Sequence, residues 1–258
     1  MNYIFLFYYL SCALAYNFNR PTPRSDKLYV VGGVEVSPHS LPYQAAILVD
    51  DTYFCGGAVI SNRYVITAAH CVWDCRFVQV LLGAHKWRVR ETTQRNFYSN
   101  TIIIHENYTG QKVEDNDIAL IKSPMSIPFS SSIKSIALPD DGCCNFTGST
   151  AMLSGWGYTS TNGGISSVLR KVYLQVESLA WCAKYFSYVN KSQICTKGTD
   201  SITGSVGACY GDSGGPLVKS DVLIGVVSFG SDACDMGYPS VYTNISYHRD
   251  WIRKHSGV

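Results

Sequence analysis

The sequence predicts an all-β protein built from two packed β units, with a short helix at its C-terminal end. Two observations favour this class. Short runs rich in β-branched and aromatic residues alternate with turn residues, and helical periodicity is nearly absent before the last dozen residues. About a dozen strands at this spacing indicate β-sandwiches or β-barrels. A polar, proline-bearing segment over 123–135 is typical of a connection between two such units.

The expected strands are the apolar runs between turn signals. In chain order they are YQAAILV (43–49), GGAVIS (56–61), VQVLLG (78–83), NTIIIHE (100–106), DIALIK (117–122), TAMLSGW (150–156), LRKVYLQV (169–176), DVLIGVVSF (221–229) and PSVYTNI (239–245). The final stretch, 246–258, places Tyr247, Trp251 and Ile252 at helical spacing, which predicts a short amphipathic helix.

Charge and the N-terminal residues restrict the partners and the compartment. The 258-residue chain has a formal net charge of +2 and no basic run longer than a doublet, so we expect no nucleic-acid partner. The run IFLFYYLSCALA ends in a small-x-small pattern, so residues 1–15 are interpreted as a secretory signal peptide. An uncleaved anchor is the alternative, but the run is shorter than the roughly 20 residues of a membrane span. We therefore expect a secreted, extracellular protein without a membrane segment.

Nine of the ten cysteines remain once Cys12 leaves with the signal peptide. An oxidising compartment favours disulfides, and the odd count leaves at least one thiol free or bonded to another molecule. A zinc site is the rival interpretation, but no Cys or His spacing suits one, so we expect no metal and no cofactor. Four Asn-x-Ser/Thr sequons permit glycosylation, at Asn107, Asn145, Asn190 and Asn244.

Three segments carry groups that could act together: ITAAHC (66–71), DNDIAL (115–120) and GDSGGP (211–216). The glycines around Ser213 favour a tight turn that exposes the hydroxyl and directs backbone N–H groups to one point. A serine hydroxyl reacts at neutral pH only if an imidazole such as His70 takes its proton. That imidazole in turn needs a carboxylate such as Asp117 to orient it. An ordinary surface turn is the alternative for the serine alone.

With these motifs the chain resembles the chymotrypsin-like serine proteases. The motifs follow the family order: VVGG (30–33), CGG (55–57), TAAHC (67–71), DIAL (117–120), GWG (155–157) and GDSGGP (211–216). Within the family the chain is similar to the brachyurin branch, the crab collagenases and their insect relatives, through VGGVEVSPHSLPYQAA, VLLGAH, IHENY and SFGS…C…GYP. The resemblance implies two six-stranded antiparallel Greek-key β-barrels within 30–258, joined near 123–135, and a propeptide at 16–29.

The resemblance also implies roles for single residues. Ser213 matches the nucleophile, His70 the general base and later acid, and Asp117 the orienting carboxylate. The backbone N–H groups of Gly211 and Ser213 match the oxyanion-hole donors. The family pairing joins Cys55–Cys71, Cys182–Cys195 and Cys209–Cys234. Cys75, Cys143 and Cys144 have no family partners. Adjacent cysteines bridge only with strain, so we expect Cys75 to pair with one of the other two or to stay free.

Activation is expected to depart from the trypsin pattern. In the family a cut before Val-Val-Gly-Gly frees an α-ammonium that pairs with the aspartate preceding the nucleophile, which implies Val30 and Asp212 here. Tyr29 precedes Val30, so a trypsin-like cut after Lys27 would leave extra residues. A displaced ammonium could not neutralise a buried aspartate. We expect cleavage after Tyr29, by a chymotrypsin-like activator or by the enzyme itself.

The resemblance places the pocket for the side chain before the scissile bond at Gly207, Ala208, Tyr210, Ser228, Phe229, Gly230 and Ser240. Gly207 at its base carries no carboxylate, so we expect large apolar or aromatic side chains there rather than Arg or Lys. Tyr210 flanks the entrance, and the alternative is a ring that folds inward and blocks it. A calcium loop is not expected, because its acidic positions match Ala84 and Gln94 and leave Glu91 alone.

Two classes of function are compatible with these features. The leading one is a secreted, monomeric serine endopeptidase. It would cleave protein or peptide substrates in digestive or extracellular proteolysis, and protein protease inhibitors are possible partners. The alternative is a catalytically silent, protease-like binding protein in which Tyr210 blocks the primary pocket. A toxin- or clotting-type protease with one narrow target is a third interpretation.

Overall fold

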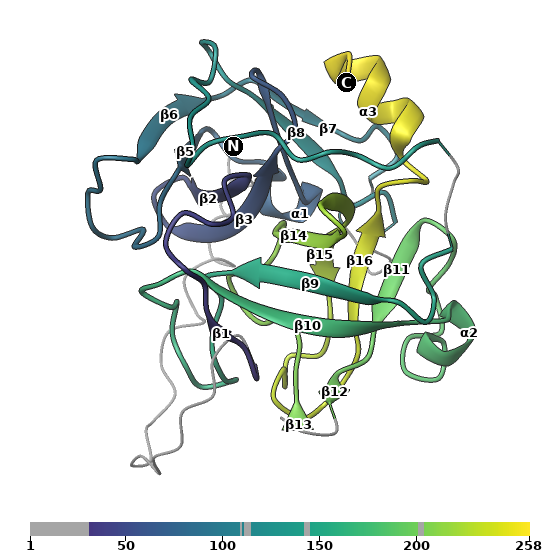
Figure 1. The fold of residues 1–258 in the computed structure, drawn as a ribbon. Helices are drawn as coiled ribbons and strands as arrows, with labels where there is room; N and C mark the ends of the chain where they lie inside the picture. The colour runs from purple at the N-terminus through teal and green to yellow at the C-terminus, as the bar shows by residue number, and fades with distance from the viewer. Residues whose placement is uncertain (1–30, 109, 111–114, 142–144, 201–203) are drawn as a thin grey trace, which may run out of the picture.

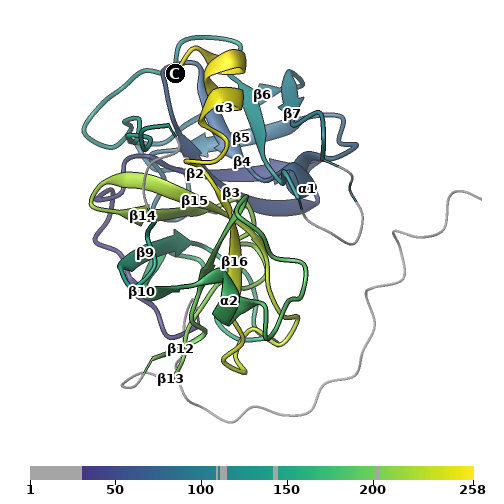
Figure 2. The ribbon, with the colours of Figure 1, turned by 90° about the vertical axis from the view of Figure 1, so that its right-hand side faces the viewer.

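Two antiparallel β-sheets, one above the other in both views, form the body of the protein (Figures 1 and 2). The structure is a computed structural model that describes residues 31–108, 110, 115–141, 145–200 and 204–258. The expected signal peptide, the propeptide with Tyr29, and Val30 lie outside the described residues, as do Cys143 and Cys144.

The first sheet is formed by the N-terminal half of the chain. Its strands are β2 (Gln44–Val49), β3 (Tyr53–Val59), β4 (Tyr64–Thr67), β5 (Val78–Leu82), β6 (Arg95–Ser99), β7 (Ile102–Ile104) and β8 (Ala119–Lys122). Their order in space is β6-β5-β2-β3-β4-β8-β7. Because β6 and β7 are successive in the chain and only residues 100–101 separate them, the chain itself joins the two ends of this sheet.

The second sheet contains a closed barrel. Its strands are β1 (Val34–Glu35), β9 (Thr150–Gly155), β10 (Arg170–Glu177), β11 (Gln193–Thr196), β14 (Pro216–Lys219), β15 (Val222–Phe229) and β16 (Ser240–Asn244). β9 pairs with both β10 and β14, which closes six strands into a ring, and β1 adds to the edge of β10. A separate hairpin consists of β12 (Thr199–Asp200) and β13 (Gly204–Ser205).

Both sheets follow the same connection rule. The fourth long strand lies beside the first, in the orders β5-β2-β3-β4 and β14-β9-β10-β11. This arrangement is a Greek key. The expected fold class, two antiparallel Greek-key barrels with a short C-terminal helix, is confirmed. The difference is that the N-terminal barrel is completed by the chain between β6 and β7 rather than by strand pairing.

The connection between β8 and β9 is less independent than its polar composition suggested. Ile127 and Ile133 are buried in the core of the N-terminal barrel. The backbone N–H of Lys134 donates to the carbonyl of Pro42 at 3.0 Å. Segment 123–135 is therefore a packed connection, held to the barrel by its isoleucines.

The helices are short: α1 (Ala69–Val72), α2 (Leu179–Cys182) and α3 (Arg249–Ser256). Among the described residues, none of them is long and apolar enough to cross a membrane. Trp251 and Ile252 lie in α3 and are buried, but Tyr247, expected at the same helical spacing, precedes the helix and is 47% exposed. Glu106 ties α3 to the N-terminal barrel by accepting hydrogen bonds from Trp251 Nε1 (2.7 Å) and His255 Nε2 (2.9 Å).

Among the described residues three disulfides are present, and they are the three that the family resemblance implied: Cys55–Cys71, Cys182–Cys195 and Cys209–Cys234. Cys75 is a free, half-buried thiol, which is one of the two outcomes expected for it. Burial raises the pKa of this thiol above its ordinary value, so its reactive thiolate form is disfavoured.

Candidate active site

His70 and Asp117 meet at the side of the N-terminal barrel that faces the second barrel. His70 lies in the one-turn helix α1, just after β4, and Asp117 lies just before β8. His70 Nδ1 is 2.8 Å from Asp117 Oδ2, and the backbone N–H of His70 donates to Asp117 Oδ1 at 2.9 Å. An Nδ1–H held by the carboxylate leaves Nε2 as the proton acceptor, and the ring is 26% exposed.

Asp117 is completely buried and is held by both barrels. Ser228 of β15 donates its hydroxyl to Asp117 Oδ2 at 2.6 Å, and Thr243 of β16 donates to the Asp117 carbonyl at 2.6 Å. Burial by itself raises the pKa of this carboxyl. The opposite charge of His70 and the hydrogen bonds from His70 and Ser228 outweigh burial, so the pKa lies below its usual value. The carboxylate is therefore ionised at neutral pH.

Backbone contacts seat the turn of Ser213 against the segment that carries His70. The N–H of Gly56 donates to the Ser213 carbonyl at 2.7 Å, and Thr67 Oγ1 donates to the Gly56 carbonyl at 2.8 Å. Gly214 has a φ of +76°, and a Cβ there would overlap the Thr67 hydroxyl. Only glycine allows this close approach of the two barrels.

Some backbone N–H groups of the Ser213 turn are hydrogen-bonded and others are not. The N–H groups of Asp212, Gly214 and Gly215 donate to backbone carbonyls at 2.8–2.9 Å. Those of Gly211 and Ser213 find no acceptor within the part of the chain that the structure describes. Gly211 has a left-handed φ of +91°. Two unengaged donors, two residues apart in such a turn, suit the recognition of an oxyanion.

A cavity of about 200 Å³ opens beside Ser213 between two walls of the second barrel. The Cys209–Cys234 disulfide joins these walls. The lining residues are Ala208, Cys209, Tyr210, Ser213, Val227, Ser228, Phe229, Gly230, Ser231, Asp232 and Cys234. Five residues that were expected in the pocket line it: Ala208, Tyr210, Ser228, Phe229 and Gly230.

Gly207 and Ser240, also expected in the pocket, do not line this cavity. Ser240 is buried, and its hydroxyl accepts the N–H of Ala208 at 3.1 Å. A Cβ at Gly207 would lie 2.9 Å from that hydroxyl oxygen. The serine therefore supports the wall of the cavity from behind.

Tyr210 sits at the rim of the cavity with 48% of its surface exposed. Its hydroxyl donates to Asp232 Oδ1 on the opposite wall at 3.2 Å, and its ring meets Tyr158 edge-on with centroids 5.7 Å apart. Burial and the Asp232 carboxylate raise the pKa of this phenol. Asp232 was not assigned to the pocket from the sequence. The one signal that could have placed it there is its position two residues after Gly230, on the same wall.

Asp212, next to the serine, is also completely buried. Its carboxylate accepts the N–H groups of Gly157 (2.8 Å) and Cys209 (3.2 Å), and a Cβ at Gly155 or Gly157 would overlap it. No cationic side chain of the described residues reaches it. Burial raises its pKa to about 7. Asp212 is therefore a buried carboxylate in a glycine-lined space, and a positively charged partner would stabilise its ionised form.

Two Greek-key barrels that hold a His–Asp pair where they meet, with a glycine-rich serine turn packed against the same barrel, define the two-barrel serine hydrolases. The family model described as Trypsin matches residues 30–252, and the chain belongs to the trypsin family. It is a serine endopeptidase.

Curated relatives support this assignment. A Brachyurin from Leptuca pugilator is 42% identical over 231 residues, covering 89% of this chain and 99% of that protein. A Chymotrypsin from Phaedon cochleariae is 37% identical, with coverages of 89% and 83%. A Trypsin-1 from Astacus astacus is 35% identical, with coverages of 87% and 98%. The similarity to a Brachyurin agrees with the branch that the motifs indicated.

Proposed function

We propose that this protein is a secreted endopeptidase that cleaves peptide bonds through an acyl-enzyme formed on Ser213. The observation that supports this most is the 2.8 Å contact between His70 Nδ1 and Asp117 Oδ2, in a site that also holds Ser213. Ser213 Oγ attacks the substrate carbonyl carbon while His70 Nε2 takes its proton. The oxyanion receives hydrogen bonds from the N–H groups of Gly211 and Ser213.

The second half of the cycle uses the same groups. His70 delivers its proton to the leaving amine, and the peptide bond breaks. Water then attacks the acyl-enzyme, His70 takes a proton from it, and the serine leaves with that proton. The buried charge of Asp117 stabilises the imidazolium in both halves and keeps the ring in one orientation.

Activity after activation tests this function directly. The activated enzyme is expected to hydrolyse a succinyl-Ala-Ala-Pro-Phe chromogenic peptide and to be labelled by a fluorophosphonate at Ser213. The Ser213→Ala variant should lose labelling and about 10⁶ in kcat, because the nucleophile acts as a unit with its base. An activated, folded wild-type sample that the fluorophosphonate does not label would contradict the proposal.

We propose a preference for Phe, Tyr, Leu or Met before the cleaved bond. The cavity is lined by small and apolar residues, and its one carboxylate, Asp232, is engaged at the rim by Tyr210. One methylene changes such discrimination by only about 1–3 kcal/mol, so the preference should be broad. Profiling with a mixed peptide library measures it.

Substitutions of Tyr210 distinguish two hypotheses: an exposed ring beside the pocket, and a ring that blocks the pocket. Because the ring lies at the surface, Tyr210→Ala should leave hydrolysis of the Phe peptide within about threefold of wild type. Tyr210→Phe removes the hydroxyl that engages Asp232 and should raise cleavage after Arg relative to Phe by up to about tenfold. Steady-state kinetics on matched Phe and Arg peptides measures both. Activity that appears only in Tyr210→Ala would instead favour the silent binding protein.

We propose secretion with removal of residues 1–15, a propeptide at 16–29 and a monomeric domain from Val30 onward, active in digestive or extracellular proteolysis. The three disulfides support an oxidising compartment. Cleavage after Tyr29 would make Val30 the first residue. Its new α-ammonium could then pair with the buried carboxylate of Asp212.

The four sequons should differ in occupancy. Asn107 and Asn145 are exposed, and their side-chain amides donate to no described residue. Asn190 Nδ2 instead donates to Asp115 Oδ1 at 2.7 Å, and Asn244 Nδ2 donates to the Lys191 carbonyl at 3.2 Å. A glycan on an engaged amide would disturb these contacts. Glycopeptide mass spectrometry of protein from a eukaryotic secretory host should find glycans at Asn107 and Asn145 and not at the other two.

A further inference from the structure

A groove on the N-terminal barrel has no part in the proposed chemistry. Its volume is about 650 Å³, compared with about 200 Å³ for the cavity beside Ser213. Its lining residues come from β2, β5, β6 and the loop before β6: Leu48, Gln79, Leu81, Trp87, Arg88, Val89, Arg90, Gln94, Arg95 and Asn96. No aspartate or glutamate is among them.

The groove combines an apolar base with a fixed aromatic wall. Leu48 and Leu81 lie on the paired strands β2 and β5. Trp87 donates its Nε1–H to the Ser166 carbonyl at 2.9 Å and packs against Phe54 with ring centroids 4.8 Å apart. Val89 adds an exposed apolar side chain. A bound molecule would thus meet preformed apolar surface.

Three arginines surround this surface, and none of them forms an ion pair within the described residues. Arg88 places its guanidinium 4.6 Å from the Trp87 ring. Arg95 donates through one nitrogen to the carbonyls of Thr92 and Gln94. Arg90 is exposed and contacts no described polar group. The positive charge is therefore concentrated and uncompensated.

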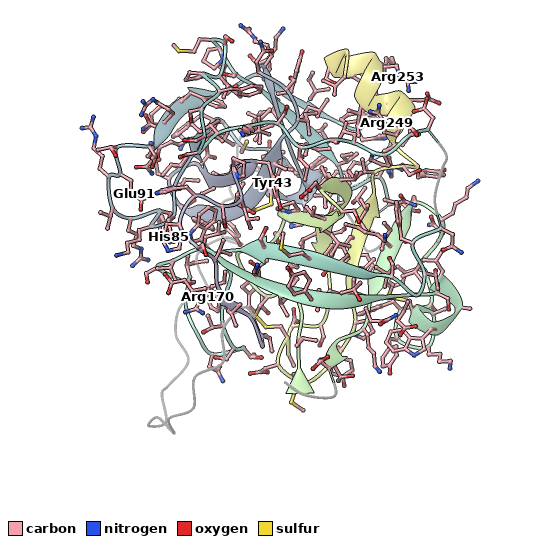
Figure 3. The ribbon with its side chains drawn as sticks, viewed as in Figure 1. Tyr43, His85, Glu91, Arg170, Arg249 and Arg253 are labelled. Carbon is pink, nitrogen blue, oxygen red and sulfur yellow. A yellow bond between two sulfur atoms is a disulfide. The ribbon has the colours of Figure 1, made fainter. Side chains whose placement is uncertain are left out.

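The nearest acidic side chain of the loop, Glu91, does not neutralise the arginines. Its Oε2 accepts the backbone N–H of His85 at 2.6 Å, and its Oε1 accepts that of Lys86 at 3.3 Å. Figure 3 shows Glu91 and His85 on the loop at the left of the N-terminal barrel. The carboxylate is used inside the loop and holds its shape, which fixes the arginines on the outside.

A short chain of contacts links the groove to the active site. Phe54, which packs on Trp87, has its Cδ1 atom 3.7 Å from the position that a Cβ on Gly211 would take. One aromatic ring therefore separates the groove from the glycine that we assign to the oxyanion hole. Trp87 of the groove and Gly211 beside Ser213 thus both neighbour the same side chain.

We propose that this groove binds an acidic, partly apolar segment of a polypeptide substrate, away from the bond that is cut. Guanidinium groups recognise carboxylates through paired hydrogen bonds, and the apolar base accepts aliphatic or aromatic side chains of the same segment. A sulfated polysaccharide offers negative charge but no apolar side chains, so a peptide fits both halves of the groove. That the segment belongs to a substrate rests on the proposed protease function, whereas its binding does not.

Binding is tested on the Ser213→Ala enzyme, which cannot cut the probe. The probe is a short fluorescein-labelled peptide that alternates glutamate with leucine and phenylalanine, and its control carries glutamine for glutamate. Fluorescence anisotropy should show saturable binding of the glutamate peptide that weakens as ionic strength rises. The Arg88→Glu/Arg90→Glu pair should weaken binding at least about tenfold. The matched control, Lys134→Glu/Lys184→Glu, reverses two exposed charges outside the groove and should change it less than twofold.

Several outcomes would overturn the proposal: no binding by the parent enzyme, equal binding by the arginine variant, equal binding of the glutamine peptide, or binding of heparin but not of the peptide. The role in substrate selection has its own measurement. The arginine variant with Ser213 intact should cleave a protein substrate bearing an acidic segment at least about fivefold more slowly in kcat/KM, and a short uncharged chromogenic peptide at the wild-type rate. Equal loss on both substrates would show damage to the active site instead, and loss on neither would contradict the role in selection.

Discussion

The Asp117→Asn variant is expected to lose about 10⁴ in kcat with little change in KM. The carboxylate takes hydrogen bonds from His70 Nδ1 and from the His70 backbone, and its charge stabilises the imidazolium that forms when Ser213 attacks. An amide in its place keeps the shape but removes the charge and disfavours the tautomer in which Nε2 accepts the proton. The same substitution in the template enzyme of this mechanism lowers kcat by about 10⁴.

The control for this variant is Ser228→Ala. It removes one hydrogen bond to Asp117 Oδ2 but leaves the charge, so its loss in kcat should be about tenfold or less. Steady-state kinetics against pH, with thermal unfolding to verify the fold, measures both. An Asp117→Asn enzyme within tenfold of wild type would show that the buried carboxylate is structural and would remove the basis of the proposed mechanism.

Cutting the chain before Val30 is expected to change how stability depends on pH. Burial raises the pKa of Asp212 in the folded protein from 3.8 to about 7. The folded state then holds this proton more tightly than the unfolded state. The uncut chain is therefore fully stabilised by this group below about pH 4 and loses that stabilisation, about 4 kcal/mol, as pH rises to about 7. In the cut form an ammonium partner favours the ionised carboxylate, and this loss should disappear.

The measurement is urea unfolding of the Ser213→Ala protein between pH 4 and 8, before and after cleavage, with the first residue of the cut form determined by sequencing. The uncut Asp212→Asn variant is the control and should show no such fall in stability over this range. Identical pH profiles for cut and uncut protein would show that no ion pair forms at Asp212. A fully active enzyme that begins at Leu28 would refute cleavage after Tyr29.

The parts of the fold that local patterns could predict are those whose burial is regular. The apolar runs that became β2, β5, β9, β10 and β15 stand out because alternate or consecutive side chains enter a core. β6, with the sequence RNFYS, did not stand out because most of its side chains face solvent. β14 begins at a proline and has only four residues. Such strands are stabilised by neighbours that lie far away in the chain, and no local signal reports them.

The site divides in the same way. His70, Asp117 and Ser213 were predicted because each lies in a distinctive short motif. The second donor to Asp117, the hydroxyl of Ser228, and the bond between Tyr210 and Asp232 were not predicted, because they depend on which strands meet. Ser240 was assigned to the pocket by position, yet the register of β16 turns its hydroxyl toward the Ala208 backbone behind the wall. The groove of arginines likewise exists only when β2 and β5 pair beneath the loop.

Asp117 belongs to the N-terminal half of the chain, but Ser228 and Thr243, which donate to it, belong to the C-terminal half. The enzyme's competence is thus a property of the pair of barrels and of neither one separately. A slip of one barrel along the other by a single hydrogen-bond length would unfold nothing and would still silence the enzyme.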